Sequence, residues 1–122
     1  IVKRINIKEN ILFEFTKFLN TIIDPYNTKD KAYMIGWNSK FDSDFLHQLF
    51  STSKVNYGNY FHHMPVDIQN LFVYKSMFKN KKPDNFKLET IAKFLGIKVN
   101  HDKFHDAEYD IDITNKIYLK IK

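Results

Sequence analysis

The stretch from His105 to Asp112 constrains the fold most, because it joins a histidine and alternating carboxylates to the start of an apolar helical pattern. Two residues five positions apart lie about 140° apart around a helix of 3.6 residues per turn. His105 and Asp110 can therefore face one cleft only if His105 precedes the regular helix. We predict that His105 lies on a loop and Asp110 in the first or second turn. The alternative is a plain acidic helix start, whose carboxylates complement the helix dipole.

Apolar residues recur at helical spacing in five segments of the chain. They predict helices over about residues 7–23, 42–50, 71–78, 88–95 and 107–121. Asn6, three residues before Glu9, is expected to start the first helix in the manner of a capping box, and Asp24-Pro25 is expected to end it. Asp67 is expected to cap the third helix, and Gly96 to close the fourth in the left-handed conformation.

Two short apolar runs have the character of strands. Ala32–Ile35 ends at a glycine and is typical of a strand buried on both faces. Met64–Ile68 is predicted to form a second short strand that leads into a helix. Together with the helices, they predict an α/β fold in which the first strand delivers the chain to Asn38 and Asp42.

The chain has 122 residues, enough for one domain with one core. Its net charge of +5 would attract a polyanion such as nucleic acid. An AT-rich coding sequence explains the same lysine excess equally well. The run Lys79–Asn85 is the most basic, and we read it as a solvated loop, with phosphate contact as the alternative.

The sequence has no cysteine, which leaves carboxylates and imidazoles as the strong metal ligands and favours hard, oxygen-preferring ions. The adjacent histidines His62 and His63 are not a zinc site by this reasoning, since adjacent side chains point apart in helix or strand. The aromatic residues Tyr57, Tyr60 and Phe61 suit core packing better than base stacking. No segment approaches the roughly 20 apolar residues of a membrane span, so we expect a cytoplasmic protein without membrane contact.

Asn38-Ser39-Lys40-Phe41-Asp42 resembles the second motif of the DEDDh exonucleases, the DnaQ-like proofreading family, in which an Asn-x-x-Phe-Asp ends a strand and opens a helix. The segment from His105 to Asp110 resembles the third motif of that family, His-x-Ala-x-x-Asp. Residues 86–97 are similar to the helix before the third motif. The resemblance covers nearly all of the chain from the first helix onward. It implies the carboxyl-terminal portion of a ribonuclease H-like α/β fold, with about five helices and two short parallel strands.

The resemblance implies a metal-dependent 3′–5′ exonuclease that hydrolyses DNA, as in replication proofreading. It assigns Asp42 and Asp110 to Mg²⁺ or Mn²⁺, and His105 to taking a proton from the attacking water. Histidine suits that role because its reference pKa is about 6.5. Asn38 and Phe41 would contact the substrate. Two metals about 3.5–4 Å apart stabilise both the attacking and the leaving oxygens.

The first motif of the family, an Asp-x-Glu on the central strand, has no match here. Glu9 and Glu14, the acids ahead of Asn38 on a regular element, both fall on a predicted helix. We therefore expect residues 1–122 to form a single partial exonuclease domain that lacks the first three strands and is nearly inactive alone. The sequence opens on Ile1 rather than methionine, as expected of a fragment. An unpaired strand edge at Ala32–Ile35 would invite a second copy of the chain or an amino-terminal segment.

The expected partners are single-stranded DNA, with RNA as the alternative, and a DNA polymerase. A second hypothesis is a non-catalytic nucleic-acid-binding or assembly module that keeps the exonuclease frame without its first carboxylates. A third is a helical domain whose acid clusters are only helix starts.

Overall fold

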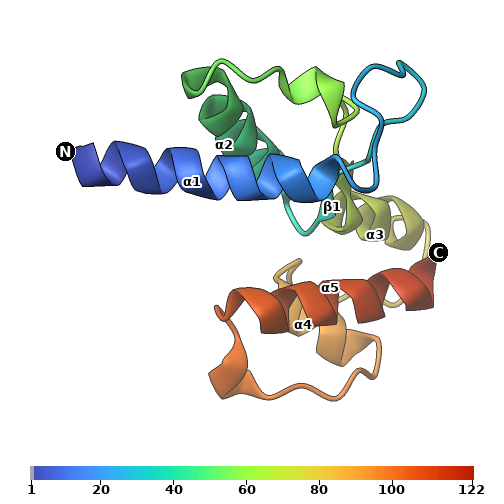
Figure 1. The fold of residues 1–122 in the computed structure, drawn as a ribbon. Helices are drawn as coiled ribbons and strands as arrows, with labels where there is room; N and C mark the ends of the chain where they lie inside the picture. Colours follow the sequence, from blue (N-terminus) through green and yellow to red (C-terminus); the bar gives the residue numbers. More distant parts are fainter. Residues whose placement is uncertain (1) are drawn as a thin grey trace. The chain divides into compact units, whose positions relative to one another are not determined.

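The computed structural model describes the backbone of residues 2–122 and the side chains of residues 10–122 (Figure 1). Within these residues the chain forms five α-helices, two 3₁₀-helices and one two-stranded parallel sheet. The predicted mixed α/β class with two short parallel strands is confirmed at this level. The elements in chain order are α1 (Val2–Leu19), β1 (Ile35–Gly36), α2 (Ser39–Thr52), η1 (Tyr57–Asn59), β2 (Val66–Asp67), α3 (Ile68–Ser76), α4 (Leu88–Phe94), η2 (His101–Lys103) and α5 (Ala107–Ile121).

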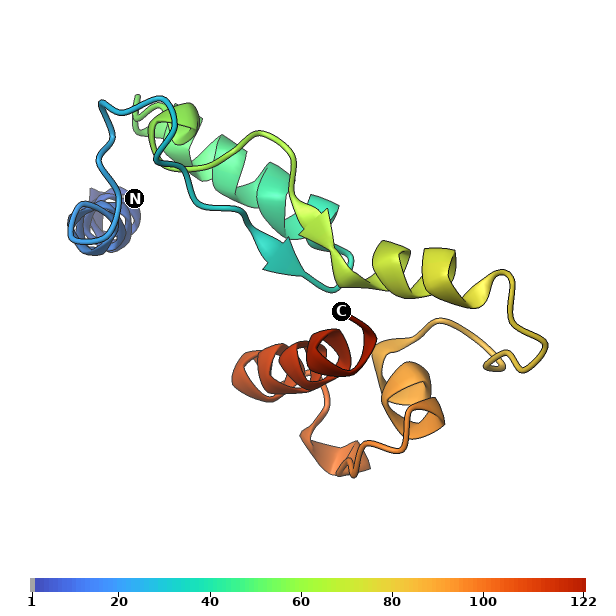
Figure 2. The same cartoon turned by 90° about the vertical axis from the view of Figure 1, so that its right-hand side faces the viewer.

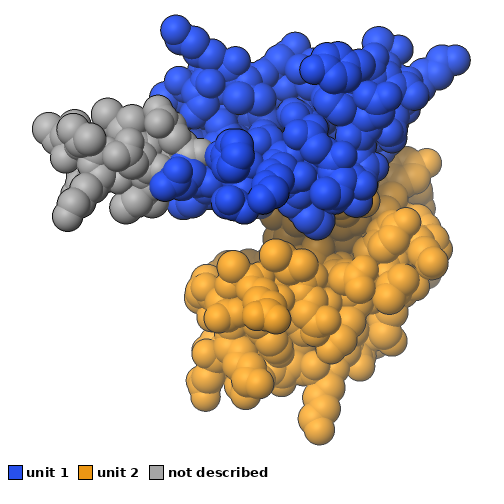
Figure 3. Space-filling view, viewed as in Figure 1, with its two compact units in different colours: residues 1–34, 40–65 blue, residues 35–39, 66–122 orange. Residues whose placement is uncertain are grey.

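The chain divides into two compact units (Figure 3). Unit 1 comprises residues 1–34 and 40–65, and unit 2 comprises residues 35–39 and 66–122. Each unit has its own cluster of buried hydrophobic side chains. The expectation of one core is therefore wrong, because the buried residues that the structure describes form two separate clusters.

The core of unit 1 surrounds Phe50, which is fully buried near the end of α2. The rings of Tyr57, Tyr60 and Phe61 pack edge-on against Phe50 at centroid distances of 5.6 to 6.3 Å. Edge-to-face rings at this separation attract each other beyond the area that they bury. The three aromatic residues are buried, so their predicted role in core packing is confirmed.

The first helix, α1, differs from its prediction at both ends. It begins at Val2, so Asn6 lies inside the helix and the predicted start there is wrong. It ends at Leu19 rather than at residue 23, because the amides of Thr21 and Ile22 bond to carbonyls three residues back in tighter turns. Neither α1 nor any other helix in the described part of the chain is long and apolar enough to cross a membrane.

The sheet is shorter than predicted. In Figure 2, β1 and β2 lie side by side as two short arrows, with Ile35 opposite Val66 and Gly36 opposite Asp67. Ala32 forms only an isolated parallel bridge with Phe61. The prediction of a strand over Ala32–Ile35 buried on both faces is wrong, since Ile35 is 54% exposed.

The second predicted strand, Met64–Ile68, is reduced to the two residues of β2, and Ile68 already belongs to α3. The predicted cap is confirmed: the Asp67 side chain accepts a hydrogen bond from the amide of Gln69 at 2.9 Å. An oxygen acceptor at this position satisfies one of the free amides at the helix start. The third helix ends at Ser76 and does not extend to 78 as predicted.

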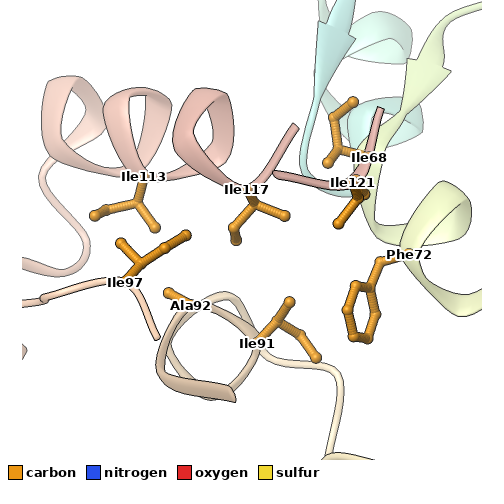
Figure 4. Packing of buried hydrophobic residues seen from close by; sticks show 8 residues of the cluster. All are labelled: Ile68, Phe72, Ile91, Ala92, Ile97, Ile113, Ile117 and Ile121. Carbon is orange, nitrogen blue, oxygen red and sulfur yellow. The ribbon is translucent and has the colours of Figure 1, made fainter. Parts of the chain in front are cut away.

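The core of unit 2 is formed by apolar side chains of α3, α4 and α5 together with Ile97. These side chains point toward one another in Figure 4. The fourth and fifth helices occupy nearly the predicted residues. Gly96 has φ +76°, the left-handed conformation predicted for the residue that closes α4. The buried members of the cluster are Ile68, Phe72, Ile91, Ala92, Ile97, Ile113, Ile117 and Ile121.

The two adjacent histidines of unit 1 do not point apart as expected. The rings of His62 and His63 stack at 4.7 Å with an angle of 24° between their planes. Tyr33 stacks on His62 at the same centroid distance. The expectation fails because residues 62–64 lie between elements, where the alternation of side chains in helix or strand does not apply.

Candidate functional site

The third-motif residues meet where the loop enters α5. Asp106 is the cap of α5 and its side chain accepts a hydrogen bond from the amide of Tyr109 at 3.1 Å. His105 lies just before this cap, on the loop, and Asp110 lies in the first turn. The backbone amide of His105 donates to Oδ1 of Asp110 at 3.3 Å. The predicted placement of both residues is confirmed, and this hydrogen bond brings them together.

His105 adopts a strained backbone conformation. Its φ is +76°, in the left-handed region that costs a residue with a side chain roughly 1–2 kcal/mol. Such conformations persist where the surrounding structure holds them in place. Here the carboxylate of Asp110 holds the amide of His105, and the amide of Asp106 bonds to the carbonyl of Lys103 at 3.2 Å.

Tyr109 attaches the incoming loop to α5. Its hydroxyl accepts a hydrogen bond from the amide of Asn100 at 2.7 Å. Its ring packs edge-on against Phe104 at 5.2 Å. Tyr109 thus positions the loop that carries His105. The sequence reasoning did not single it out, although an aromatic residue beside the apolar stripe of a helix is a weak signal for such a contact.

A second attachment joins the loop to α4. Nδ1 of His101, in η2, lies 2.6 Å from Oε1 of Glu89, in the first turn of α4. Nζ of Lys93 lies 3.5 Å from the same oxygen. The hydrogen bond with His101 is the main cause that holds the pKa of Glu89 below its ordinary value of 4.5, and the charges of His101 and Lys93 act in the same direction.

We expect the substitution His101→Ala to raise the pKa of Glu89 toward 4.5, because the main cause of its depression is removed. A carboxyl group with a depressed pKa stabilises the fold above its ordinary pKa, and this stabilisation is lost as the pH falls from 4.5 through the lowered value. An NMR titration of the Glu89 Cδ shift measures the change. Lys116→Ala, which removes the ion pair with Asp112, is the control. An equal Glu89 pKa in wild type and His101→Ala would contradict the expectation.

An open depression of about 800 Å³ lies beside the start of α5 within unit 2. Its lining carries four carboxylates, one lysine and His105, so its charge is predominantly negative. Such a surface attracts cations rather than phosphates. Among the residues with described side chains, no three histidine, aspartate or glutamate groups lie close enough together to hold a metal ion. The lining residues are Asp102, Lys103, Phe104, His105, Asp106, Glu108, Tyr109 and Asp112.

In the second motif, Asn38 lies just after β1 in unit 2. It has φ +54°, and its amide donates to Oδ1 of Asp67 at 3.0 Å. The same oxygen accepts the amide of Gln69 in α3. Asp67, predicted only as a helix cap, therefore also fixes the turn that carries Asn38. Two of the predicted site residues, Asn38 and His105, thus have left-handed backbones held by an aspartate.

Phe41 and Asp42 lie on α2 in unit 1. Asp42 is in the first turn, where a carboxylate complements the positive end of the helix dipole, and it is exposed. Phe41 is 75% exposed. The predicted site residues are therefore distributed over both units, with Asn38, His105 and Asp110 in unit 2.

No protein-family model, no curated protein and no solved structure matches this chain. The case for the candidate site therefore depends on the residues themselves and their contacts.

Proposed function

We propose that this chain carries part of the active site of a metal-dependent 3′–5′ exonuclease acting on single-stranded DNA. The observation that carries the proposal is the contact between His105 and Asp110 at the start of α5. A histidine on a loop, directly before a helix whose first turn holds an aspartate, is the arrangement that the third-motif resemblance requires. The contact joins the backbone amide of His105 to the side chain of Asp110.

The residues at this position suit a hard divalent cation. Asp110 is half-buried and offers a carboxylate, the ligand type preferred by Mg²⁺ and Mn²⁺. Mg²⁺ tolerates few protein ligands because it keeps water and substrate oxygens. When bound, such an ion stabilises negative charge on the phosphate and favours ionisation of a nearby water. The motif resemblance assigns Asp42 to the same task.

The residues of the chain have separate tasks in the proposed reaction. The carboxylate of Asp110 would hold the cation, and it accepts a hydrogen bond from the amide of His105. The exposed imidazole of His105 takes a proton from the attacking water. Asn38 and Phe41 contact the substrate strand.

The order β1, α2, β2 with parallel strands is that of a βαβ unit and supports the further proposal of a ribonuclease H-like fold.

The proposal requires degradation that depends on metal. We expect a labelled single strand to be degraded in Mn²⁺ and left intact in EDTA by the chain together with any residues that its gene encodes upstream. The chain alone should be far less active, because no Asp-x-Glu precedes its second motif. Equal degradation in Mn²⁺ and EDTA would contradict the proposal.

The second candidate is a non-catalytic nucleic-acid-binding module, favoured by the positive charge of the chain. This candidate predicts salt-sensitive binding of a single strand without its degradation, both by the chain alone and by the chain with any upstream residues.

A further inference from the structure

The positive charge of the chain is concentrated in one exposed segment of unit 2. Residues 74–87 contain five lysines and one aspartate, a net charge of +4, against +5 for the whole chain. The segment includes the end of α3 and the loop that follows. All five lysines are exposed.

Two large aromatic side chains are exposed in the same segment. Tyr74 lies in the last turn of α3 and is 66% exposed. Phe78 follows the helix, four positions later, and is 82% exposed. The amide of Lys79 bonds to the carbonyl of Ser76 at 3.0 Å, so a turn continues the helix past Phe78. Both side chains are therefore largely exposed.

The lysines beyond the helix are not neutralised by described carboxylates. Lys40, Lys93 and Lys116 each form an ion pair with an acid on their own helix. No described carboxylate lies within ion-pair distance of the lysines of residues 74–87. Of these, Lys75 donates to the carbonyl of Ile121 and thereby joins α3 to the end of α5. We define the lysine-aromatic surface as Tyr74, Phe78, Lys79, Lys81 and Lys82.

The loop that carries this surface is held at its far end. The ring of Phe86 packs against the buried Phe72 at 6.2 Å. Nε2 of Gln69 donates to the carbonyl of Phe86 at 2.9 Å, and the side chain of Asn85 accepts the amide of Lys87. The anchoring is therefore done by other residues, and the lysine-aromatic surface is left without a partner in the described part of the chain.

We propose that the lysine-aromatic surface binds single-stranded nucleic acid, with its lysines on phosphates and with Tyr74 and Phe78 stacked on bases. A single strand offers both negative charge and accessible base faces. A duplex hides its base faces, and an anionic lipid surface has none. The inference deepens the proposed exonuclease, because it names a surface that would hold the substrate strand apart from the residues assigned to the reaction.

The first test compares two triple variants of the full chain that lose the same charge. Lys79→Gln, Lys81→Gln and Lys82→Gln remove the surface lysines, and Lys40→Gln, Lys93→Gln and Lys116→Gln remove ion-paired ones. Fluorescence anisotropy with a labelled oligothymidylate, in EDTA, gives the affinity. The salt slope is the slope of log K against log[salt], and removing one lysine–phosphate pair lowers it by about 0.7. The surface variant should therefore show a slope smaller by about 2 and an affinity roughly 100-fold weaker near 0.1 M salt. An equal loss in both variants would overturn the proposal.

A second test isolates stacking. Tyr74→Ala with Phe78→Ala should weaken binding by about tenfold for each base that is no longer stacked, and should leave the salt slope unchanged. Leu119→Ala, another exposed apolar residue of unit 2, is the control. Unchanged affinity in the aromatic variant, equal affinity for a duplex, or stronger binding to phosphatidylserine vesicles would each overturn the proposal. EDTA prevents metal-dependent turnover, so this assay measures binding alone. A failure of the binding proposal can therefore be told apart from a failure of the exonuclease proposal.

Discussion

Replacing Asp110 with Asn is expected to lower the rate of Mn²⁺-dependent strand degradation by about 10³-fold, because a metal ion contributes several kcal/mol of charge stabilisation and each 1.4 kcal/mol is about tenfold in rate. Asn has nearly the same shape as Asp and keeps an oxygen that accepts the amide of His105. The substitution therefore removes the charge and preserves the local fold. Initial rates at saturating Mn²⁺, measured on the chain together with any residues that its gene encodes upstream, give the effect.

The matched control is Asp112→Asn. Asp112 is also in the amino-terminal half of α5, but its carboxylate pairs with Lys116 at 2.9 Å. This variant loses the same charge, and its rate should stay close to that of the wild type. Equal losses in the two variants would show that the overall charge near α5, rather than Asp110, controls the rate.

Replacing Ile117 with Ala should destabilise unit 2 by about 2–5 kcal/mol. Ile117 is completely buried and lies in Figure 4 among side chains from α3 and α4. Deleting its outer carbons removes buried apolar area and leaves a cavity, which adds to the cost. Since whole domains are stable by only about 5–15 kcal/mol, the effect is large.

Urea unfolding followed by tryptophan fluorescence measures this loss directly. Trp37 is the single tryptophan of the chain and packs against the cluster of unit 2. Leu119→Ala, on the exposed side of the same helix, should change the free energy of unfolding by no more than about 0.5 kcal/mol. A loss below about 1 kcal/mol in Ile117→Ala, on the order of a surface change, would contradict the packing of this core.

The helices of unit 2 were predictable because their signals are local and repeated. α5 has apolar residues at helical spacing, of which Ile117 and Ile121 are buried as expected, whereas Ile111 is 70% exposed and Ile113 is buried instead. Gly96 marks the end of α4 because few other residues accept its backbone conformation cheaply. Signals of this kind do not depend on contacts with residues that are distant in the sequence.

The strands were not predictable at the same level. β1 and β2 have two residues each, too few to show alternation, and their extent depends on which backbone groups find a partner. The stacked rings of His62 and His63 likewise depend on an irregular backbone that no periodic pattern describes.

The placement of His105 on a loop and of Asp110 in a helix turn was predictable, and their contacts were not. The order of His105 and Asp110 along the chain placed one on a loop and the other in a helix. The left-handed backbone of His105 and the hydrogen bond of Tyr109 with Asn100 follow from the path of the loop. That path is set by the hydrogen bonds that attach the loop to α4 and α5. They join residues 12 and 9 positions apart in the sequence, so no local sequence pattern predicts them.

The most direct test of the exonuclease proposal is the direction of digestion. A single strand labelled at its 5′ end is incubated in Mn²⁺ with the chain and any residues that its gene encodes upstream. The proposal predicts a ladder of labelled products that shorten from the 3′ end, and its absence when Asp110 is replaced with Asn. A strand that stays at full length, or that is cut at internal positions, would contradict it.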